Sequence, residues 1–489
     1  MTLRALLLSA LGLGLSVAFA PAAAQTVEWP TENPPPALLP HDVVFPEYEI
    51  RTLENGLRVV YVGHHEQPAV NVRLLLRAGA SNDPIGKPGV AALVGQLLDQ
   101  GTTTRSAQAI AGEIDNIGGA LAVGAGGDLS FVDAIVMKDS FDLALDMLAD
   151  VTRRPVFATQ EIERQRQQVL SSIQVSYDDP AYIATVVFNR LVYGFHPYGM
   201  PQNGTPESIR AITRDDLVSF HRAYYLPNNA VLAVVGDVTA DEAFAEVERA
   251  LGNWERGAQP VFKAEDVPEA TRRLVVVDRP GAVQTTVRVG HVAFARADPD
   301  FLAFDLAVKI LGGEGGNRLG LVLRTERSLT YAASAELAGR QLSGDFMAKT
   351  DTRSAATSEA LRLTVDEIAR MGRESVHPRE LQGAQDYLAG NFPITIETPN
   401  AIATQVLEAM LFGLDLDELE TYPERINAVT VDDIQRVAEN HLKTASLTIV
   451  LVGDASTFVR DLPGIGFDRF EVIPLAELDL STVDLRRPR

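Results

Sequence analysis

Residues 230–237 read AVLAVVGD, and residues 448–454 read TIVLVGD. Each is an apolar run that ends in Gly-Asp, a pattern typical of a buried strand followed by a turn. Gly236 and Gly453 are 217 residues apart. Similar strands at a fixed distance indicate that one structural unit occurs twice in the chain.

A second pair of apolar runs has the same separation. GLRVVYV (56–62) is similar to RRLVVVD (272–278), and Leu57 and Leu274 are again 217 residues apart. One such pair is common by chance, whereas two pairs with one offset predict a duplicated domain.

Each predicted repeat alternates strands with amphipathic helices. FDLALDMLADV (141–151) and ALRLTVDEIARM (360–371) have apolar residues at helical spacing, while VNVRLLLRAG (70–79) has the composition of a strand. The sequence therefore predicts an α+β protein with two homologous, α/β-layered domains.

The ends of the chain differ from these domains. MTLRALLLSALGLGLSVAFAPAAA has Arg4, an apolar run and then small residues, which predicts a secretory signal peptide and a bacterial periplasmic protein. Six prolines in the next segment indicate an extended arm. The predicted organisation is a signal peptide (1–24), a Pro-rich arm (25–47), a first domain (48–251), a linker (252–273), a second domain (274–455) and a C-terminal tail (456–489), which either packs on the second domain or binds a partner.

Composition excludes several classes of function. The 489 residues have a formal net charge of −22, so nucleic acid and anionic membrane surfaces are unfavourable partners. No cysteine is present, which excludes disulfides and thiolate metal sites. After the signal peptide, no segment is long and apolar enough to span a membrane.

The stretch GVAALVGQLLDQGT (89–102) predicts a helix that packs on a core. Its apolar residues recur at helical spacing: Val90, Leu93, Val94, Leu97 and Leu98. The neighbouring face carries Ala92, Gly95 and Gln96, and none of these side chains is a typical zinc ligand.

Two longer stretches resemble a known family. FHPYGMPQNGTPESIRAITRDDLVSFHRAYYLPNNAVLAVVGDV (195–238) and LGGEGGNRLGLVLRTERSLTYAASA (311–335) resemble the pitrilysin-like (M16, or inverzincin) zinc peptidases, which include mitochondrial processing peptidase. The similarity covers most of residues 48–455. It implies two homologous α+β domains that form half of a clam-shell.

The resemblance places the family's zinc motif on residues that cannot bind zinc. The HxxEH motif falls on Ala92, Gly95 and Gln96, and the third ligand, a later Glu, falls on Ser172. The edge-strand Asn that helps to hold substrate in active relatives falls on Ala122. We therefore expect no metal and no cofactor in this chain.

Arg324 and Tyr331, in RTERSLTY, match a pair that active members carry opposite the zinc. The resemblance implies that Tyr331 donates a hydrogen bond to the carbonyl oxygen of the bond being cleaved and that Arg324 holds the substrate backbone. We expect Arg324 to end a helix and Tyr331 to open a strand. In the alternative interpretation, Arg324 caps helix carbonyls and Tyr331 packs in a core.

His196 and His221 also lie in the family-like stretch. Without a nearby zinc motif, we interpret both as hydrogen-bonded structural residues.

In some members of the family, one subunit carries the zinc motif and its homologue carries the Arg/Tyr pair. This chain resembles the second kind of subunit, because it has the Arg/Tyr pair and lacks the zinc motif. We therefore expect a periplasmic subunit, inactive alone, that pairs with a zinc-bearing HxxEH homologue and binds extended peptide substrates, with Zn²⁺ on the partner. The alternatives are a structural or assembly subunit and an unpaired peptide-binding protein. The retained Arg324/Tyr331 pair favours the heterodimeric peptidase.

Overall fold

The computed structural model describes residues 45–258, 269, 271–313 and 316–487. The predicted signal peptide (1–24) lies outside this range, as do most of the predicted arm (25–47) and part of the predicted linker (252–273). The predicted domain boundaries therefore stay predictions. Within the described residues, no helix combines the length and the apolar character that a membrane crossing requires.

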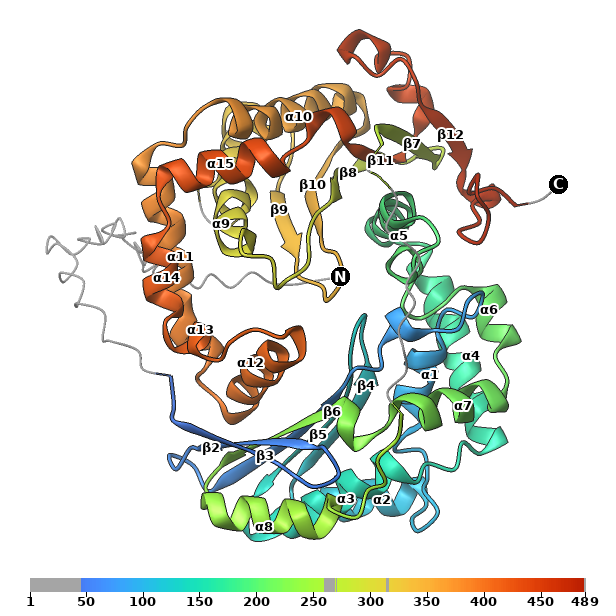
Figure 1. Ribbon diagram of the computed structural model, residues 1–489. Helices are drawn as coiled ribbons and strands as arrows, with labels where there is room; N and C mark the ends of the chain where they lie inside the picture. The colour runs from blue at the N-terminus through green and yellow to red at the C-terminus, as the bar shows by residue number, and fades with distance from the viewer. Residues whose placement is uncertain (1–44, 259–268, 270, 314–315, 488–489) are drawn as a thin grey trace, which may run out of the picture. The chain divides into compact units, whose positions relative to one another are not determined.

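Two six-stranded sheets form the framework of the described part of the chain (Figure 1). Their strand orders are β1-β2-β6-β3-β5-β4 and β12-β7-β11-β8-β10-β9. The strands are β1 (Tyr48–Thr52), β2 (Arg58–Gly63), β3 (Ala69–Leu76), β4 (Ala120–Ala125), β5 (Ser130–Met137), β6 (Ala230–Gly236), β7 (Arg273–Asp278), β8 (Gln284–Val292), β9 (Ala333–Ala338), β10 (Asp345–Arg353), β11 (Thr448–Gly453) and β12 (Glu471–Pro474).

Helices pack on both sheets. Those of the first half are α1 (Val90–Leu97), α2 (Ala107–Asn116), α3 (Phe141–Arg153), α4 (Thr159–Ser176), α5 (Pro180–Tyr193), α6 (Pro206–Ala211), α7 (Arg214–Tyr224) and α8 (Ala240–Leu251). Those of the second half are α9 (Phe301–Gly312), a π-helix (Gly320–Glu326), α10 (Thr357–Arg373), α11 (Pro378–Thr395), α12 (Pro399–Phe412), α13 (Asp417–Glu420), α14 (Tyr422–Ala428) and α15 (Val431–His441).

Five strands of the first sheet, in the order β2-β6-β3-β5-β4, correspond to five of the second, in the order β7-β11-β8-β10-β9. This correspondence confirms the predicted duplication. The register of one predicted pair is wrong, however. Arg58 pairs with Val231 and Arg273 pairs with Thr448, so that Arg58 is equivalent to Arg273. Equivalent residues of β2 and β7 are therefore two positions closer in sequence than equivalent residues of β6 and β11, and Leu57 is not equivalent to Leu274.

The central strands explain the apolar runs in the sequence. Every residue of β6 and of β11 is buried. Both strands have helices on both faces, so their side chains are apolar on both sides rather than alternating.

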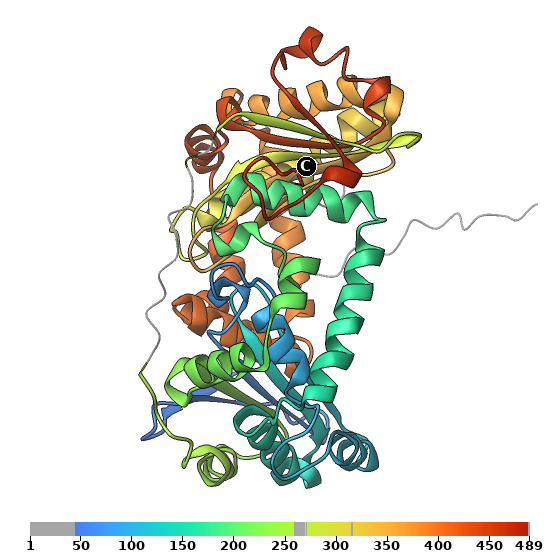
Figure 2. The same cartoon turned by 90° about the vertical axis from the view of Figure 1, so that its right-hand side faces the viewer.

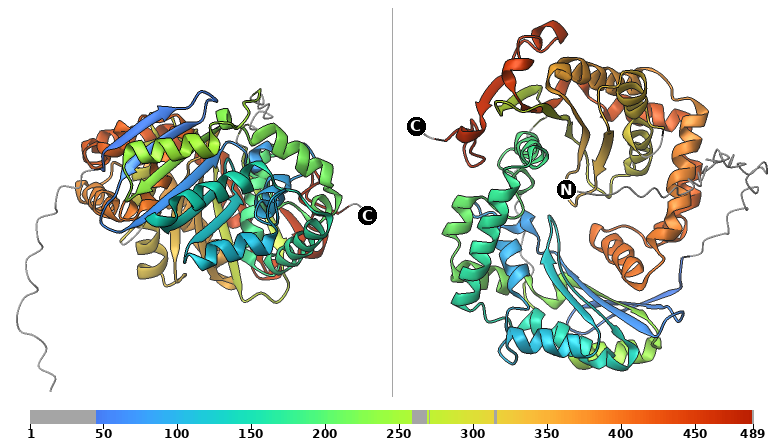
Figure 3. Two further views of the ribbon diagram at one scale, coloured as in Figure 1. Left: turned by 90° about the horizontal axis from the view of Figure 1, so that it is seen from below. Right: turned by 180° about the vertical axis from the view of Figure 1, so that it is seen from behind.

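Each half contributes a helix to the sheet of the other half. Helix α5, which follows the long helix α4, packs on β8 and β11 of the second sheet (Figure 2). Helix α12, which follows the long helix α11, packs on β3 and β6 of the first sheet (Figure 3). Arg58 and Arg77 donate to the carbonyl oxygens of Met410 and Leu411 at the end of α12. These positive charges lie where the helix dipole favours them.

The C-terminal segment extends the second sheet. Strand β12 pairs in parallel with β7 at the sheet edge. Leu478, Leu480 and Leu485 are buried in the same cluster as α5, and Arg190 of α5 donates to the Leu480 carbonyl at 2.9 Å. Of the two alternatives for this tail, the structure has it packed on the second half.

Candidate functional site

Helix α1 is held in place at its N-terminus by Asp83. The Asp83 carboxylate accepts hydrogen bonds from the backbone N–H groups of Gly89 at 2.6 Å and Ala91 at 2.7 Å. These N–H groups are among those that a helix leaves without internal partners. Burial raises the pKa of Asp83 to about 7 although both hydrogen bonds lower it. This contact was not predictable from the sequence, because Asp83 lies six residues before Gly89, which occupies the N-cap position itself.

The face of α1 that would carry the catalytic Glu is closed by backbone. A Cβ atom built on Gly95 would lie 2.6 Å from the carbonyl carbon of Gly124 and 2.8 Å from the backbone nitrogen of Ala125, both on β4. Side chains do not tolerate such distances, so β4 would have to move to admit one. The same contact occurs in the second half, where Gly312 of α9 packs against the backbone of Ala335 on β9.

The residues at the expected zinc position do not fit zinc. Ala92 is buried and Gln96 is partly buried, and the backbone carbonyl of Gln96 accepts a hydrogen bond from the side-chain amide of Gln165 on α4 at 3.3 Å. Ser172 is exposed on α4. Zinc needs about three imidazole, thiolate or carboxylate ligands, and none of these side chains supplies one. Within the described ranges, no cluster of three or more His, Cys, Asp or Glu residues could hold a metal ion.

The structure places Arg324 and Tyr331 side by side. The Arg324 guanidinium carbon lies 5.0 Å from the centroid of the Tyr331 ring. Arg324 is exposed and Tyr331 is 86% exposed, which excludes the interpretation of Tyr331 as a core residue. Tyr331 does not open a strand as expected, because β9 begins at Ala333.

Arg324 belongs to the π-helix Gly320–Glu326, which the sequence did not predict. Helices of this type are rare and occur frequently at functional sites. An ion pair anchors the start of this segment: Nε and Nη2 of the buried Arg318 donate to the two carboxylate oxygens of Glu380 on α11 at 2.7 and 2.9 Å. The hydrogen bonds from Arg318 lower the pKa of Glu380.

The loop that carries Tyr331 is held on both sides by β10. The Thr352 hydroxyl donates to the carbonyl of Leu329 at 2.8 Å, and the Thr350 hydroxyl donates to the carbonyl of Ala332 at 3.1 Å. The backbone around Tyr331 is therefore fixed, while its phenol ring extends to the surface.

Both residues line a cavity of about 700 Å³ beside β9. Glycine and alanine residues and Leu321 form part of its lining, and the larger polar and aromatic side chains there are Lys309, Asn317, Arg324, Tyr331, Glu336 and Tyr387. Hydrogen-bond donors and a phenol hydroxyl in a cavity beside an edge strand can bind the backbone of an extended peptide.

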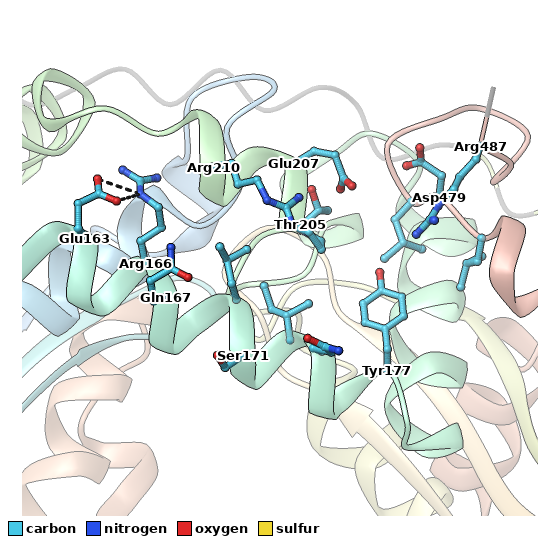
Figure 4. A pocket seen from close by; sticks show the side chains of 16 residues that line it. Glu163, Arg166, Gln167, Ser171, Tyr177, Thr205, Glu207, Arg210, Asp479 and Arg487 are labelled. Atoms are coloured by element: carbon cyan, nitrogen blue, oxygen red, sulfur yellow. Dashed lines mark hydrogen bonds and ion pairs between the residues drawn. The ribbon is translucent and has the colours of Figure 1, made fainter. Parts of the chain in front are cut away.

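A second cavity, of about 1140 Å³, lies between α4, α6 and the C-terminal segment (Figure 4). Arginines and carboxylates line it in equal number: Arg166, Arg210, Arg487, Glu163, Glu207 and Asp479. Neither sign of charge is in excess, and Arg324 and Tyr331 are not part of it. This cavity does not indicate a class of ligand.

The two histidines have structural contacts. His221 Nε2 lies 2.8 Å from the carbonyl oxygen of Thr152, and its ring stacks on Tyr225 with centroids 4.6 Å apart. His196 is 1% exposed, and its Nδ1 accepts a hydrogen bond from the backbone of Tyr198 at 3.2 Å.

Comparison with known proteins shows which family the chain resembles. The model "Insulinase (Peptidase family M16)" matches residues 58–201, and the model "Peptidase M16 inactive domain" matches residues 211–388. An uncharacterized zinc protease of Mycobacterium bovis is 28% identical over 394 residues, 80% of this chain and 90% of that protein. An uncharacterized zinc protease of Streptomyces coelicolor is 25% identical over 411 residues, 82% of this chain and 88% of that protein.

Solved structures share the fold. A peptidase M16 inactive domain from Pseudomonas fluorescens has a TM-score of 0.79 at 28% identity, covering 83% of this chain and 98% of that one. A protease from Helicobacter pylori has a TM-score of 0.77 at 23% identity, covering 83% and 99%. The repeated sheets and these matches define a two-domain, M16-type peptidase fold. The chain belongs to peptidase family M16.

Proposed function

We propose that this chain is a periplasmic M16 subunit that carries no zinc, pairs with a zinc-bearing HxxEH homologue, and contributes Arg324 and Tyr331 to peptide hydrolysis. The observation that carries the proposal is the placement of the pair: both side chains are exposed, lie 5.0 Å apart and line one cavity. The closed face of α1 at Gly95 and the N-terminal signal-peptide pattern support the other parts of the proposal.

The roles of the two residues follow from their chemistry. A peptide carbonyl under nucleophilic attack gains negative charge on its oxygen, and a positioned donor stabilises that charge. The Tyr331 hydroxyl is such a donor, and the fixed loop around it reduces the reorganisation that the reaction requires. Arg324 has several N–H donors in one plane and binds the carbonyl groups of the substrate backbone before and during the reaction.

Substitution of Tyr331 by Phe tests the proposal, because it removes one hydroxyl and keeps the ring. In the reconstituted pair, we expect kcat for a quenched peptide to fall by about 100- to 1000-fold with a smaller change in KM. Arg324→Ala should raise KM as well, since its contacts also form in the ground state.

Tyr182→Phe is the matched control, since Tyr182 lies on α5 and does not line this cavity. It should leave kcat unchanged, and thermal melts should show that every variant is folded. A normal kcat for Tyr331→Phe in an intact complex would contradict the proposal and favour a structural or peptide-binding subunit.

A further inference from the structure

The cavity that contains Arg324 and Tyr331 also holds a lysine side chain. Lys309 lies on the last turn of α9, four residues before Gly313. A Cβ atom built on Gly313 would lie 2.9 Å from the Lys309 Cα and 3.0 Å from its Cδ. The glycine therefore leaves room for the aliphatic stem of Lys309 along the end of the helix.

The positive charge of Lys309 has a weak counter-ion. Its closest carboxylate oxygen among the described residues is that of Asp305, at 3.9 Å, the outer limit of an ion pair. Burial raises the pKa of Asp305, which lowers its tendency to carry a full charge.

The other charged residues that line the cavity are Glu336 and Arg324. Glu336 forms an ion pair with Lys349 of the neighbouring strand. Within the described part of the chain, Arg324 has its contact with the Tyr331 ring and no ion pair. Among the described residues that line this cavity, the weakly paired charges are therefore positive, although the chain as a whole has a net charge of −22.

The cavity borders an open strand edge. Among the described residues, β9 is the last strand of its sheet and has β10 as its one strand partner, so its other edge presents backbone groups without a strand partner there. Residues 332–336 form one wall of the cavity. A peptide that adds to this edge directs every second side chain to the same face.

We infer that the cavity is a specificity subsite for an acidic side chain, in which Lys309 binds the carboxylate of an Asp or Glu of an extended peptide. The inference rests on the proposed function for the identity of the ligand as a peptide. It adds the preferred side chain, which the Arg324/Tyr331 pair does not determine because that pair contacts the backbone.

The test uses the full chain alone and measures binding by fluorescence anisotropy. The probes are N-acetylated, C-amidated octapeptides with one Glu at each position in turn, and a matched set with Gln. We expect the Glu peptide to bind about tenfold more tightly than its Gln partner in at least one register, because a charge-assisted hydrogen bond replaces a neutral one. The preference should decrease above about 0.3 M salt.

Variants assign the effect to one residue. Lys309→Met keeps the stem and removes the charge, so the Glu and Gln peptides should then bind within about twofold of each other. Lys309→Arg should keep the preference. Lys138→Met removes an exposed lysine that follows β5 and pairs with Asp237, and it should leave the preference unchanged.

The outcomes separate this inference from the proposed function. Equal affinities in every register, no binding up to about 1 mM, or a preference that survives in Lys309→Met would overturn the acidic subsite. Hydrolysis by the reconstituted pair with a Tyr331-dependent kcat would still support the peptidase role. Conversely, the glutamate preference could depend on Lys309 while Tyr331→Phe leaves kcat of the complex unchanged. That result would support the acidic subsite and contradict the catalytic role of Tyr331.

Discussion

At the scale of single residues, His221 shows how the core of the first half depends on protonation. Its Nε2 lies 2.8 Å from the Thr152 carbonyl oxygen, so this nitrogen must carry the proton of the neutral ring. Burial lowers the pKa of His221 to about 4, from a usual value near 6.5. Since the unfolded chain binds a proton at higher pH than the folded chain, stability is lost as pH falls from about 6.5 towards 4.

His221→Gln removes this titration. Between pH 7.5 and 5, the native chain should lose about 1–2 kcal/mol of unfolding free energy that the variant does not lose. Urea unfolding at both pH values measures this loss for each protein. The variant lacks the stacking on Tyr225 at both pH values, so that change cancels in its own pH difference. An equal pH dependence in both proteins would mean that His221 titrates normally in the folded state.

At the scale of elements, the contact between α1 and β4 determines which side chains fit at the expected zinc position. Gly95→Ala places a methyl group against the backbone of Gly124, and we expect a loss of about 1–3 kcal/mol of stability. Gly112→Ala is the matched control, because Gly112 lies within α2 and an added Cβ would meet no atom within 4 Å. It should stabilise the chain by about 0.5–1 kcal/mol. Similar melting temperatures for both variants would show that β4 moves aside without a loss of stability.

The same contact bears on attempts to restore the zinc motif. The combined substitutions Ala92→His, Gly95→Glu, Gln96→His and Ser172→Glu supply every expected ligand type. Because Gly95 has no room for a side chain, we expect less than one zinc per chain by metal analysis and a lower melting temperature. One tightly held zinc per chain would show that β4 can move aside.

The elements also show what the sequence could predict. Long apolar runs identified β6 and β11, and amphipathic spacing identified α3 and α10, because burial on one or both faces determines those patterns. The register of Leu57 against Leu274 was wrong by two residues. A strand repeats its faces every two residues, so such a slip keeps the apolar pattern and cannot be seen in the sequence.

The candidate site was predictable only in part. The resemblance identified Arg324 and Tyr331, and the structure brings them together. The π-helix around Arg324 and the backbone contact at Gly95 were not predictable, since both depend on residues distant in the chain, such as Glu380 and Gly124. The exchange of α5 and α12 between the two sheets was missed for the same reason.

At the scale of the whole described unit, a buried cluster joins the two halves. Asp345 of β10 accepts hydrogen bonds from Tyr193 of α5 at 2.8 Å and from Arg340 at 2.9 Å. The Arg340 guanidinium lies about 5 Å from the ring centroids of both Tyr193 and Tyr198. Asp345→Asn would leave Arg340 without its carboxylate and should cost about 3 kcal/mol in urea unfolding.

Asp241→Asn is the control for that substitution. Its side chain is 94% exposed and meets Arg51 at 3.4 Å, so its loss should change stability by less than about 0.5 kcal/mol. If both variants unfold at the same urea concentration, the cluster does not hold the two halves together.

The missing zinc ligands also determine how the chain should behave alone and in an assembly. Because Ala92, Gly95, Gln96 and Ser172 supply no zinc ligand, the purified chain should contain substoichiometric zinc and show no chelator-sensitive peptidase activity alone. Co-expression with an HxxEH homologue from the same cell should give a one-to-one complex by size-exclusion chromatography with mass measurement. Peptide hydrolysis should appear only in that complex, because each chain then supplies the groups that the other lacks. A chain that stays monomeric beside every such homologue, or that hydrolyses peptides alone, would show that its exposed Arg324/Tyr331 pair serves another purpose.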